Sequence, residues 1–446
     1  MPDDLQDCPD SGARTVTAAD HTLNESRSAT TDGYAVGQEI EVTVDKVAHG
    51  GHFVARHGDL VVFVRHALPG ERVSARVTEI NPHYLRADAI EIHSTHPARV
   101  MPECAAFRPG GCGGCDFAHA DNEFQRELKL QVLREALTRQ GKLPPEQVDA
   151  LTSAGITDLG IPTGWRMRMR YRTLRRDNGV VLAMHAHRSE ELVDVTSCVI
   201  ANSAGHAQAL EMSRSSPEGG EVLMAVDTNG PVVDFIPAGS HGRTRNHVVH
   251  TIEVDNRKLD FRTRIDGFWQ VHPALAQSLV ETVLAWTDPQ PGQRWWDLYA
   301  GVGPIAAALA SRIDPGGHVV AVESETVAVR EARRTLERVF PGDTVSVVQA
   351  DVRKWIAARE RNEPDPFGVV LDPPRSGAGR SVLQAVAGRC PTQLIIVACD
   401  PVALGRDTAI LADCGYRLEK VRAWDAFPQT HHLETVALFS PDDQIS

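Results

Sequence analysis

The sequence predicts an α/β protein with three folded parts, and three observations support this prediction. Residues 37–95 contain several short runs of alternating apolar residues separated by Gly and Pro turns, as in a small β-barrel. Residues 101–200 carry a glycine-rich group of cysteines. From 294 to 440, short apolar strands alternate with helical patterns, which is typical of a doubly wound parallel sheet. We therefore expect a disordered tail over 1–35, a barrel over 36–95, a central α+β domain with the cysteine cluster over 96–265 and a doubly wound domain over 266–446.

Composition narrows the functional class. The chain has 446 residues and a formal net charge of −13, so any attraction to nucleic acid would depend on a local basic surface. No apolar run approaches the roughly 18 residues of a membrane span, and the N-terminus lacks the apolar core of a secretory signal. We expect a cytoplasmic protein with no membrane partner. In such a reducing compartment its eight cysteines are better explained as metal ligands, nucleophiles or core thiols than as disulfides.

A glycine loop predicts a nucleotide-like ligand. The apolar run Arg294–Leu298 is followed by Gly301 and Gly303, and a helix is expected to begin near Pro304. The loop fits G-x-G-x-x-A, which serves both dinucleotides and S-adenosylmethionine. Glu323 ends the next strand, where it can bind ribose hydroxyls of either cofactor, and Asp351 follows the third strand, where an acid could accept an adenine amino group.

Two later strand ends favour methyl transfer. Asp372-Pro-Pro-Arg forms a rigid corner beside the ligand crevice, as in methyltransferases that act on bases or amino groups, and a hydride-transfer enzyme has no obvious use for it. Cys399 ends the fifth strand, where the donor should lie, although a lone buried thiol can also be plain packing. A thiolate that attacks carbon 6 of a pyrimidine makes carbon 5 nucleophilic, and a base such as Glu434 must then remove the carbon 5 proton. We interpret His431, close to Glu434, as structural.

The cysteines of the central segment form a candidate metal site. Cys104, Cys112 and Cys115 are close in sequence, with glycines between them, and Cys198 is a remote fourth thiol. The spacing is compatible with an iron–sulfur cluster, with zinc or with a redox pair, and does not separate them. We expect His119 to be a surface residue.

An arginine-rich strand pattern follows. In Trp165–Arg172 the arginines at 166, 168, 170 and 172 alternate with Met167, Met169 and Tyr171, so a strand would place them on one face. This density favours RNA contact over a merely solvated strand face.

The assembled motifs resemble a known family. Residues 37–95 resemble a TRAM domain, an RNA-binding barrel of the OB type, and residues 37–440 resemble the bacterial RNA uridine-5 methyltransferases. The resemblance implies a Rossmann-like methyltransferase sheet, S-adenosylmethionine contacts and a 4Fe–4S cluster in preference to zinc. The implied donor contacts are Gln270, Tyr299, Glu323 and Asp372, the implied nucleophile and base are Cys399 and Glu434, and the implied cluster ligands are Cys104, Cys112, Cys115 and Cys198.

One departure concerns the nucleophile motif. It usually reads Ser-Cys-Asn-Pro and here reads Ala398-Cys-Asp-Pro, so Asp400 could hold the pKa of the thiol up. We expect a monomeric enzyme that methylates carbon 5 of a uridine in structured RNA, with ribosomal RNA favoured over transfer RNA. The alternatives are a non-catalytic RNA-binding protein with the same fold and, less favoured, a nicotinamide-dependent oxidoreductase.

Overall fold

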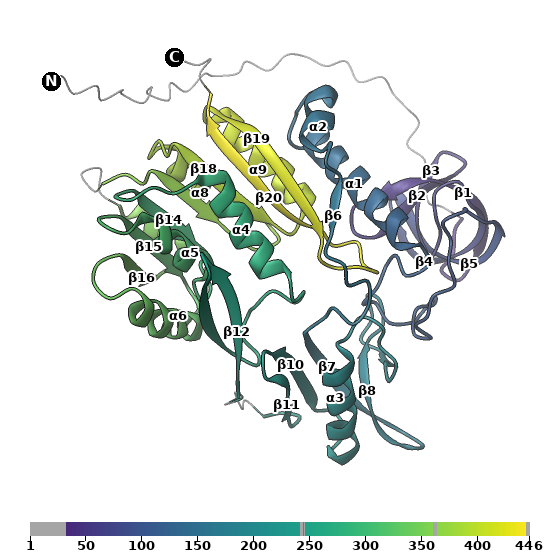
Figure 1. The fold of residues 1–446 in the computed structure, drawn as a ribbon. Coiled ribbons are helices and arrows are strands. Elements are labelled where there is room, and N and C mark those ends of the chain that lie inside the picture. The colour runs from purple at the N-terminus through teal and green to yellow at the C-terminus, as the bar shows by residue number, and fades with distance from the viewer. Residues whose placement is uncertain (1–32, 241–243, 245, 360–363, 443–446) are drawn as a thin grey trace.

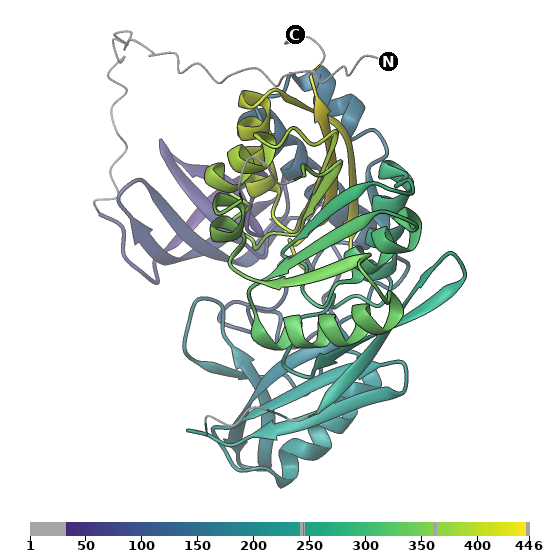
Figure 2. The ribbon, with the colours of Figure 1, turned by 90° about the vertical axis from the view of Figure 1, so that its left-hand side faces the viewer.

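The computed structural model describes residues 33–240, 244, 246–359 and 364–442 (Figure 1). The tail predicted over 1–35 therefore lies almost wholly outside the described residues. In Figures 1 and 2 the central sheet (teal) lies below the C-terminal sheet (green and yellow), and in Figure 1 the barrel (purple) lies beyond helix α1. Within the described part of the chain, no helix is both long enough and apolar enough to span a membrane.

The N-terminal part is a closed barrel of the predicted kind. Its strands pair in the order β1-β2-β3-β5-β4. Alternation in the sequence sets the inward face: Ile40, Val42 and Val44 are buried and the residues between them are exposed. The strand bounds are β1 Glu39–Ala48, β2 His52–His57, β3 Leu60–Arg65, β4 Arg72–Asn81 and β5 Tyr84–Ser94.

The segment after the barrel leaves the central part and joins the C-terminal sheet. Helix α1 (Asn122–Arg139) begins after Asp121, which caps it by accepting a hydrogen bond from the Phe124 amide. Helix α1 packs on helix α9 of the C-terminal domain, as does α2 (Pro145–Leu151) on β19. Strand β6 (Ile156–Asp158) then pairs in parallel with β19, so residues 122–158 extend the C-terminal sheet although the sequence predicts them within 96–265.

The central sheet has the strand order β11-β10-β7-β8-β9, with α3 packed on it. The alternation predicted around residue 169 is observed, because Met169 and Tyr171 are buried on the α3 side. The arginines are largely paired: Arg170 and Arg172 both bind Glu221 of the neighbouring strand. The bounds are β7 Arg168–Arg176, β8 Gly179–His185, β9 Leu192–Asp194, α3 Ser203–Ser215, β10 Glu221–Asp227 and β11 Gly230–Ile236.

A hairpin connects the central sheet to the doubly wound domain. Strands β12 (His247–Val254) and β13 (Arg257–Arg264) pair with each other, and α4 (Leu275–Thr287) follows. Residues 266–271, between β13 and α4, lie near the carboxyl ends of strands in the next sheet, since both line one cavity.

The C-terminal sheet has eight strands in the order β16-β15-β14-β17-β18-β20-β19-β6. Strands β14 to β18 are parallel, and β20 runs antiparallel to β18. Residues along β18 alternate between two core clusters, with Ile395 and Val397 on one face and Leu394 and Ile396 on the other, so helices cover both faces. The bounds are β14 Arg294–Leu298, α5 Pro304–Ile313, β15 His318–Glu323, α6 Thr326–Val339, β16 Val345–Gln349, α7 Val352–Ala357, β17 Gly368–Leu371, α8 Arg380–Ala387, β18 Gln393–Ala398, α9 Pro401–Asp413, β19 Tyr416–Asp425 and β20 Glu434–Pro441.

Candidate active site and cysteine pocket

A cavity of about 800 Å³ opens at the carboxyl ends of the parallel strands, where a doubly wound sheet places its ligands. Seven of the eight donor-binding and catalytic residues expected from the sequence line it: Gln270, Tyr299, Gly301, Glu323, Asp372, Cys399 and Glu434. They come from the ends of β14, β15, β17 and β18, the start of β20 and the segment before α4. One cavity thus joins residues that are up to 164 positions apart in the chain, from Gln270 to Glu434.

The glycine loop is built for a close approach of backbone to ligand. Gly301 and Gly303 have φ values of 57° and 84°, a region that favours glycine, and Pro304 occupies the first position of α5 as predicted. The Gly301 amide donates to Glu323 Oε2 at 3.0 Å. Buried Asp297 accepts from the Ala306 amide at 2.8 Å and so fixes the start of the helix against β14.

Several acidic groups share this edge of the sheet. Burial raises the pKa of Asp297 to about 7, and desolvation together with the nearby Glu323 raises the pKa of Asp372 to about 7. Burial, followed by Asp372, raises the pKa of Glu434 well above its ordinary value. A ligand with positive charge would relieve this mutual repulsion, which suits the sulfonium and ammonium groups of S-adenosylmethionine.

Strand register places Cys399 and Glu434 side by side. Strand β18 pairs antiparallel with β20, and Ala398 is the partner of Thr435, so the next residues outward on the two strands are Cys399 and Glu434. The Thr435 hydroxyl donates to the Ala398 carbonyl at 2.7 Å and holds this register. The thiol and the carboxyl therefore face the same end of the cavity.

Burial and the neighbouring Glu434 both change the pKa of the Cys399 thiol. Burial and then Glu434 raise the pKa of the Cys399 thiol to about 11, whereas Arg375 opposes the shift. Asp400, suspected from the sequence, is not among the groups that raise it. Its carboxylate instead caps α9 through the Ala403 amide at 2.8 Å and pairs with His49 of the barrel at 2.8 Å.

The loop that leads to Glu434, residues 427–434, is held in place by polar groups from α1. Buried Lys129 bonds Asp425 at 2.5 Å and donates to the Phe427 carbonyl at 3.0 Å. The Gln429 amide donates to Gln125 Oε1 at 2.7 Å. Both α1 residues are buried polar side chains one turn apart, and the sequence analysis did not single them out.

The two histidines of this loop differ in role. His431 contacts Asp116 of the cysteine-bearing loop at 2.5 Å, in agreement with the structural role predicted for it. His432 lines the cavity, and burial followed by the neighbouring His431 lowers its pKa to about 3, so it is neutral near pH 7. A neutral ring can donate or accept a hydrogen bond to a ligand in the cavity but adds no positive charge.

Asp351 is the predicted donor-binding residue that this cavity does not include. It caps α7 by accepting from the Lys354 amide at 3.0 Å. Its charge does reach the cavity, because after burial Asp351 is the main cause of the raised pKa of Tyr299. A contact of Asp351 with the donor's adenine stays a prediction.

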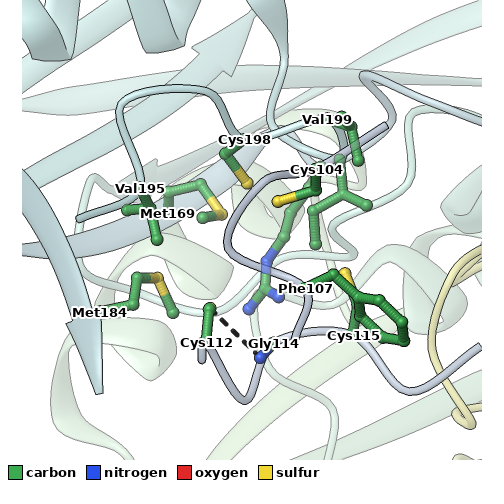
Figure 3. Close-up of a pocket in the computed structure, with 12 residues that line it drawn as sticks. Cys104, Phe107, Cys112, Gly114, Cys115, Met169, Met184, Val195, Cys198 and Val199 are labelled. Carbon is green, nitrogen blue, oxygen red and sulfur yellow. Dashed lines mark hydrogen bonds between the residues drawn. The ribbon is translucent and has the colours of Figure 1, made fainter. Parts of the chain in front are cut away.

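The four cysteines predicted as metal ligands line one pocket, together with apolar groups that include Phe107, Met169 and Met184 (Figure 3). In Figure 3 the sulfur atoms of Cys104 and Cys198 point toward each other. Burial, and less strongly the neighbouring thiols, raises the pKa of Cys112, Cys115 and Cys198. Among the described residues, no group of three or more His, Cys, Asp or Glu side chains is arranged to hold a metal ion. The donor set, four thiols in an apolar pocket, nevertheless fits the ligand requirement of an iron–sulfur cluster.

The glycines of the cysteine loop are required by close packing. A Cβ atom at Gly111 would lie 2.2 Å from the Ala106 carbonyl oxygen, and one at Gly113 would lie 2.9 Å from the His187 Cα atom. The expectation for His119 was wrong: it is 1% exposed, bonds the Ala67 carbonyl at 2.9 Å and stacks on Phe107. The segment that carries His119 packs directly on the barrel, and the sequence alone does not show this contact between distant residues.

Comparisons with known proteins agree with this geometry. The TRAM domain model matches residues 35–90, and the tRNA (uracil-5-)-methyltransferase model matches residues 365–441. The chain is 37% identical to a Streptomyces avermitilis protein described as an uncharacterized RNA methyltransferase, over 91% of this chain and 99% of that protein. It is 31% identical to the 23S rRNA (uracil(1939)-C(5))-methyltransferase RlmD of Chromohalobacter salexigens, over 96% of this chain and 94% of that protein. The chain belongs to the RNA uracil-5 methyltransferase family.

A solved structure shows the same fold. The tRNA (uracil-54, C5)-methyltransferase of Pyrococcus abyssi, crystallised with S-adenosyl-L-homocysteine, superposes with a TM-score of 0.64 at 19% identity, covering 89% of this chain and 99% of that one. The predicted barrel and methyltransferase sheet are thereby confirmed. As a member of this family the chain is an S-adenosylmethionine-dependent RNA methyltransferase, which excludes the oxidoreductase considered from the sequence.

Proposed function

We propose that this family member transfers a methyl group from S-adenosylmethionine to carbon 5 of a uridine in structured RNA, through a covalent bond between Cys399 and carbon 6. The observation that carries the proposal is the register of β18 and β20, which sets a thiol and a carboxyl side by side at the end of the donor cavity. A protein that only bound RNA would have no use for this pair, and this disfavours the non-catalytic alternative.

Different residues of the cavity would bind the methyl donor and stabilise the thiolate. The Gly301 amide and Glu323 form one wall of the donor side, and Gln270, Tyr299 and Asp372 line the same cavity. The positive charge of the donor would stabilise the Cys399 thiolate, whose pKa is about 11 without it. Oriented backbone and carboxyl groups thus hold the methyl group next to the pyrimidine.

The chemical steps follow from the thiol and carboxyl pair. The thiolate of Cys399 forms a bond to carbon 6, and the electron pair of the carbon 5–carbon 6 double bond moves onto the carbonyl at carbon 4 as an enolate. Carbon 5 then takes the methyl group and the donor sulfur leaves with its bonding electrons. Glu434 removes the carbon 5 proton, the double bond re-forms and the sulfur of Cys399 departs as thiolate. Glu434 takes this proton as its carboxylate, and the raised pKa makes that carboxylate a stronger base than an exposed one.

We also propose a 4Fe–4S cluster, with zinc as the less favoured alternative, held by Cys104, Cys112, Cys115 and Cys198. When bound, it would crosslink the cysteine loop to residue 198 by thiolate bonds. The loop's own residues are joined to the active site, since the amides of Asp116 and Phe117 donate to the Gln429 carbonyl at 2.9 and 3.0 Å.

Ribosomal RNA is the substrate class we favour over transfer RNA, because the RlmD relative covers nearly the whole chain. We propose a monomer that works in the cytoplasm. Mapping 5-methyluridine in RNA from cells with and without the protein would identify the modified position.

The test of the mechanism uses methyl-labelled donor and a Cys399→Ala variant. We expect wild type to label RNA and to form a covalent protein–RNA adduct, and the variant to do neither. Cys414→Ala is the matched control, since Cys414 is a half-buried free thiol at the end of α9, away from the cavity. Label incorporation by Cys399→Ala would refute the covalent mechanism. RNA binding by wild type without any label would instead favour the non-catalytic alternative.

A further inference from the structure

Cys399 lies in the wall between two cavities. A smaller cavity of about 150 Å³ lies on the barrel side of the thiol, between the β1–β2 turn and the start of α9. It shares Cys399, Arg375 and His432 with the donor cavity. Its other polar side chains are His49, Asp400, His431 and Lys129, the last of which bonds Asp425.

The bonds of the pyrimidine ring indicate which part of the target nucleotide faces each cavity. Carbon 6, which bonds the Cys399 sulfur, has carbon 5 on one side and nitrogen 1 on the other. Carbon 5 must face the methyl donor, and thus the larger cavity with Gly301 and Asp372. Nitrogen 1 carries the ribose, so the sugar of the target nucleotide lies within a few bonds of the sulfur, on the side away from the donor. That side is the smaller cavity.

Asp400 gives the smaller cavity a hydrogen-bond acceptor. One carboxylate oxygen accepts from the Ala403 amide and the other pairs with His49, both at 2.8 Å. A carboxylate has about four lone-pair positions, so acceptor capacity remains. The side chain is 21% exposed, which leaves it accessible to a ligand. Burial opposes its ionisation, but the bonds from His49 and the α9 amides outweigh it and lower the pKa.

We propose that the smaller cavity holds the ribose of the target nucleotide and that Asp400 accepts a hydrogen bond from its 2′-hydroxyl, oriented by His49. The enzyme then distinguishes RNA from DNA at the nucleotide it methylates, because a 2′-deoxyribose cannot donate this bond. The inference rests on the proposed attack of Cys399 on carbon 6, which fixes the side on which the sugar lies. It makes Asp400 a specificity residue.

The test compares two synthetic RNA hairpins that contain the uridine found to receive the labelled methyl group. They carry 5-fluorouridine or 5-fluoro-2′-deoxyuridine at that one position, because fluorine at carbon 5 cannot leave as a proton does and the adduct persists. We expect wild type to form the adduct about tenfold more slowly with the deoxy probe, which corresponds to about 1.4 kcal/mol. Asp400→Ser still provides a helix cap but carries no charge and reaches less far, and should reduce the ratio to about threefold or below.

Controls separate the inference from folding and from the proposed function. Asp413→Ser removes an exposed carboxylate at the other end of α9 and should keep the tenfold ratio. His49→Ala leaves α9 intact and should also reduce the ratio. Equal rates with both probes in wild type, or a full tenfold ratio in Asp400→Ser and His49→Ala, would overturn the ribose assignment while leaving the covalent mechanism in place. Absence of any adduct with the ribose probe in wild type would overturn both.

Discussion

The two loop glycines provide a matched pair for measuring how tightly the donor loop is packed. Both have positive φ, so an alanine at either position carries a backbone cost of about 1–2 kcal/mol. A Cβ atom at Gly301 would meet nothing within 4 Å, whereas one at Gly303 would lie 2.8 Å from Leu336 Cδ1. Leu336 is fully buried on α6, so overpacking adds about 1–3 kcal/mol. We therefore expect Gly301→Ala to lower the free energy of unfolding by about 1–2 kcal/mol and Gly303→Ala by about 2–5 kcal/mol.

Urea unfolding monitored by tryptophan fluorescence is a suitable assay, because Trp295 and Trp296 lie on the strand that precedes the loop. A titration with S-adenosylhomocysteine should show the larger loss of affinity for Gly301→Ala, since Gly301 lines the donor cavity and Gly303 does not. Equal destabilisation by the two substitutions would refute the reasoning, because only the contact with α6 distinguishes them.

Three further substitutions test Glu434 as the base, Lys129 as the residue of α1 that holds the 427–434 loop, and the buried carboxyl of Asp297. Glu434→Gln should form the covalent RNA adduct but accumulate it, because the carbon 5 proton is not removed; denaturing gel electrophoresis detects the adduct. Lys129→Met should lower the free energy of unfolding by about 3–5 kcal/mol, because it leaves Asp425 buried without its partner, whereas Arg126→Met on the same helix should cost at most about 1 kcal/mol. The pKa of Asp297 is about 7 in the folded protein, above its ordinary 3.8, so its stabilising contribution is largest at low pH and is lost as the pH rises through 7. Asp297→Asn should therefore gain stability relative to wild type between pH 5 and pH 7. Urea unfolding at several pH values measures this difference.

Each of these has an outcome that contradicts it. Normal turnover by Glu434→Gln would assign proton removal to another group. A similarly small loss of unfolding free energy for Lys129→Met and Arg126→Met would mean that Lys129 does not hold residues 427–434 against α1. A constant stability difference between Asp297→Asn and wild type across that pH range would mean that the carboxyl is ionised in both states.

The residues that end the parallel strands were predictable from the sequence. Parallel strands in one sheet present their carboxyl ends at one edge, so an acid or thiol just after each apolar run must meet the others there. Glu323, Asp372 and Cys399 illustrate this, and the glycine loop adds the donor wall. The strand pattern therefore located Glu323, Asp372 and Cys399 at this edge, with Glu434 near them, whereas Gln270 and Tyr299 were expected only from the family resemblance.

Contacts between distant segments were not predictable. The pairing of Asp400 with His49 joins residues 351 positions apart, and nothing in either local sequence selects the other. The same holds for Lys129 with Asp425. Arg170 and Arg172 both bind Glu221 on the adjacent strand, a pairing that the sequence did not indicate, and RNA contact by these arginines stays a prediction. Charge patterns along one strand do not show what the neighbouring strand supplies.

Strand β6 has a consequence for the order in which the chain can fold. It is made early in synthesis, yet its partner β19, which also pairs with β20, comes more than 250 residues later. Closing such a large loop is entropically slow, so the C-terminal sheet cannot be finished before nearly the whole chain has left the ribosome. Until then the α1 residues that pack on the C-terminal domain, such as Leu133 and Leu137, lack those partners, and a chain released early would be prone to aggregate. A fragment that begins at residue 266 would lack β6 and would therefore leave one edge of β19 unpaired.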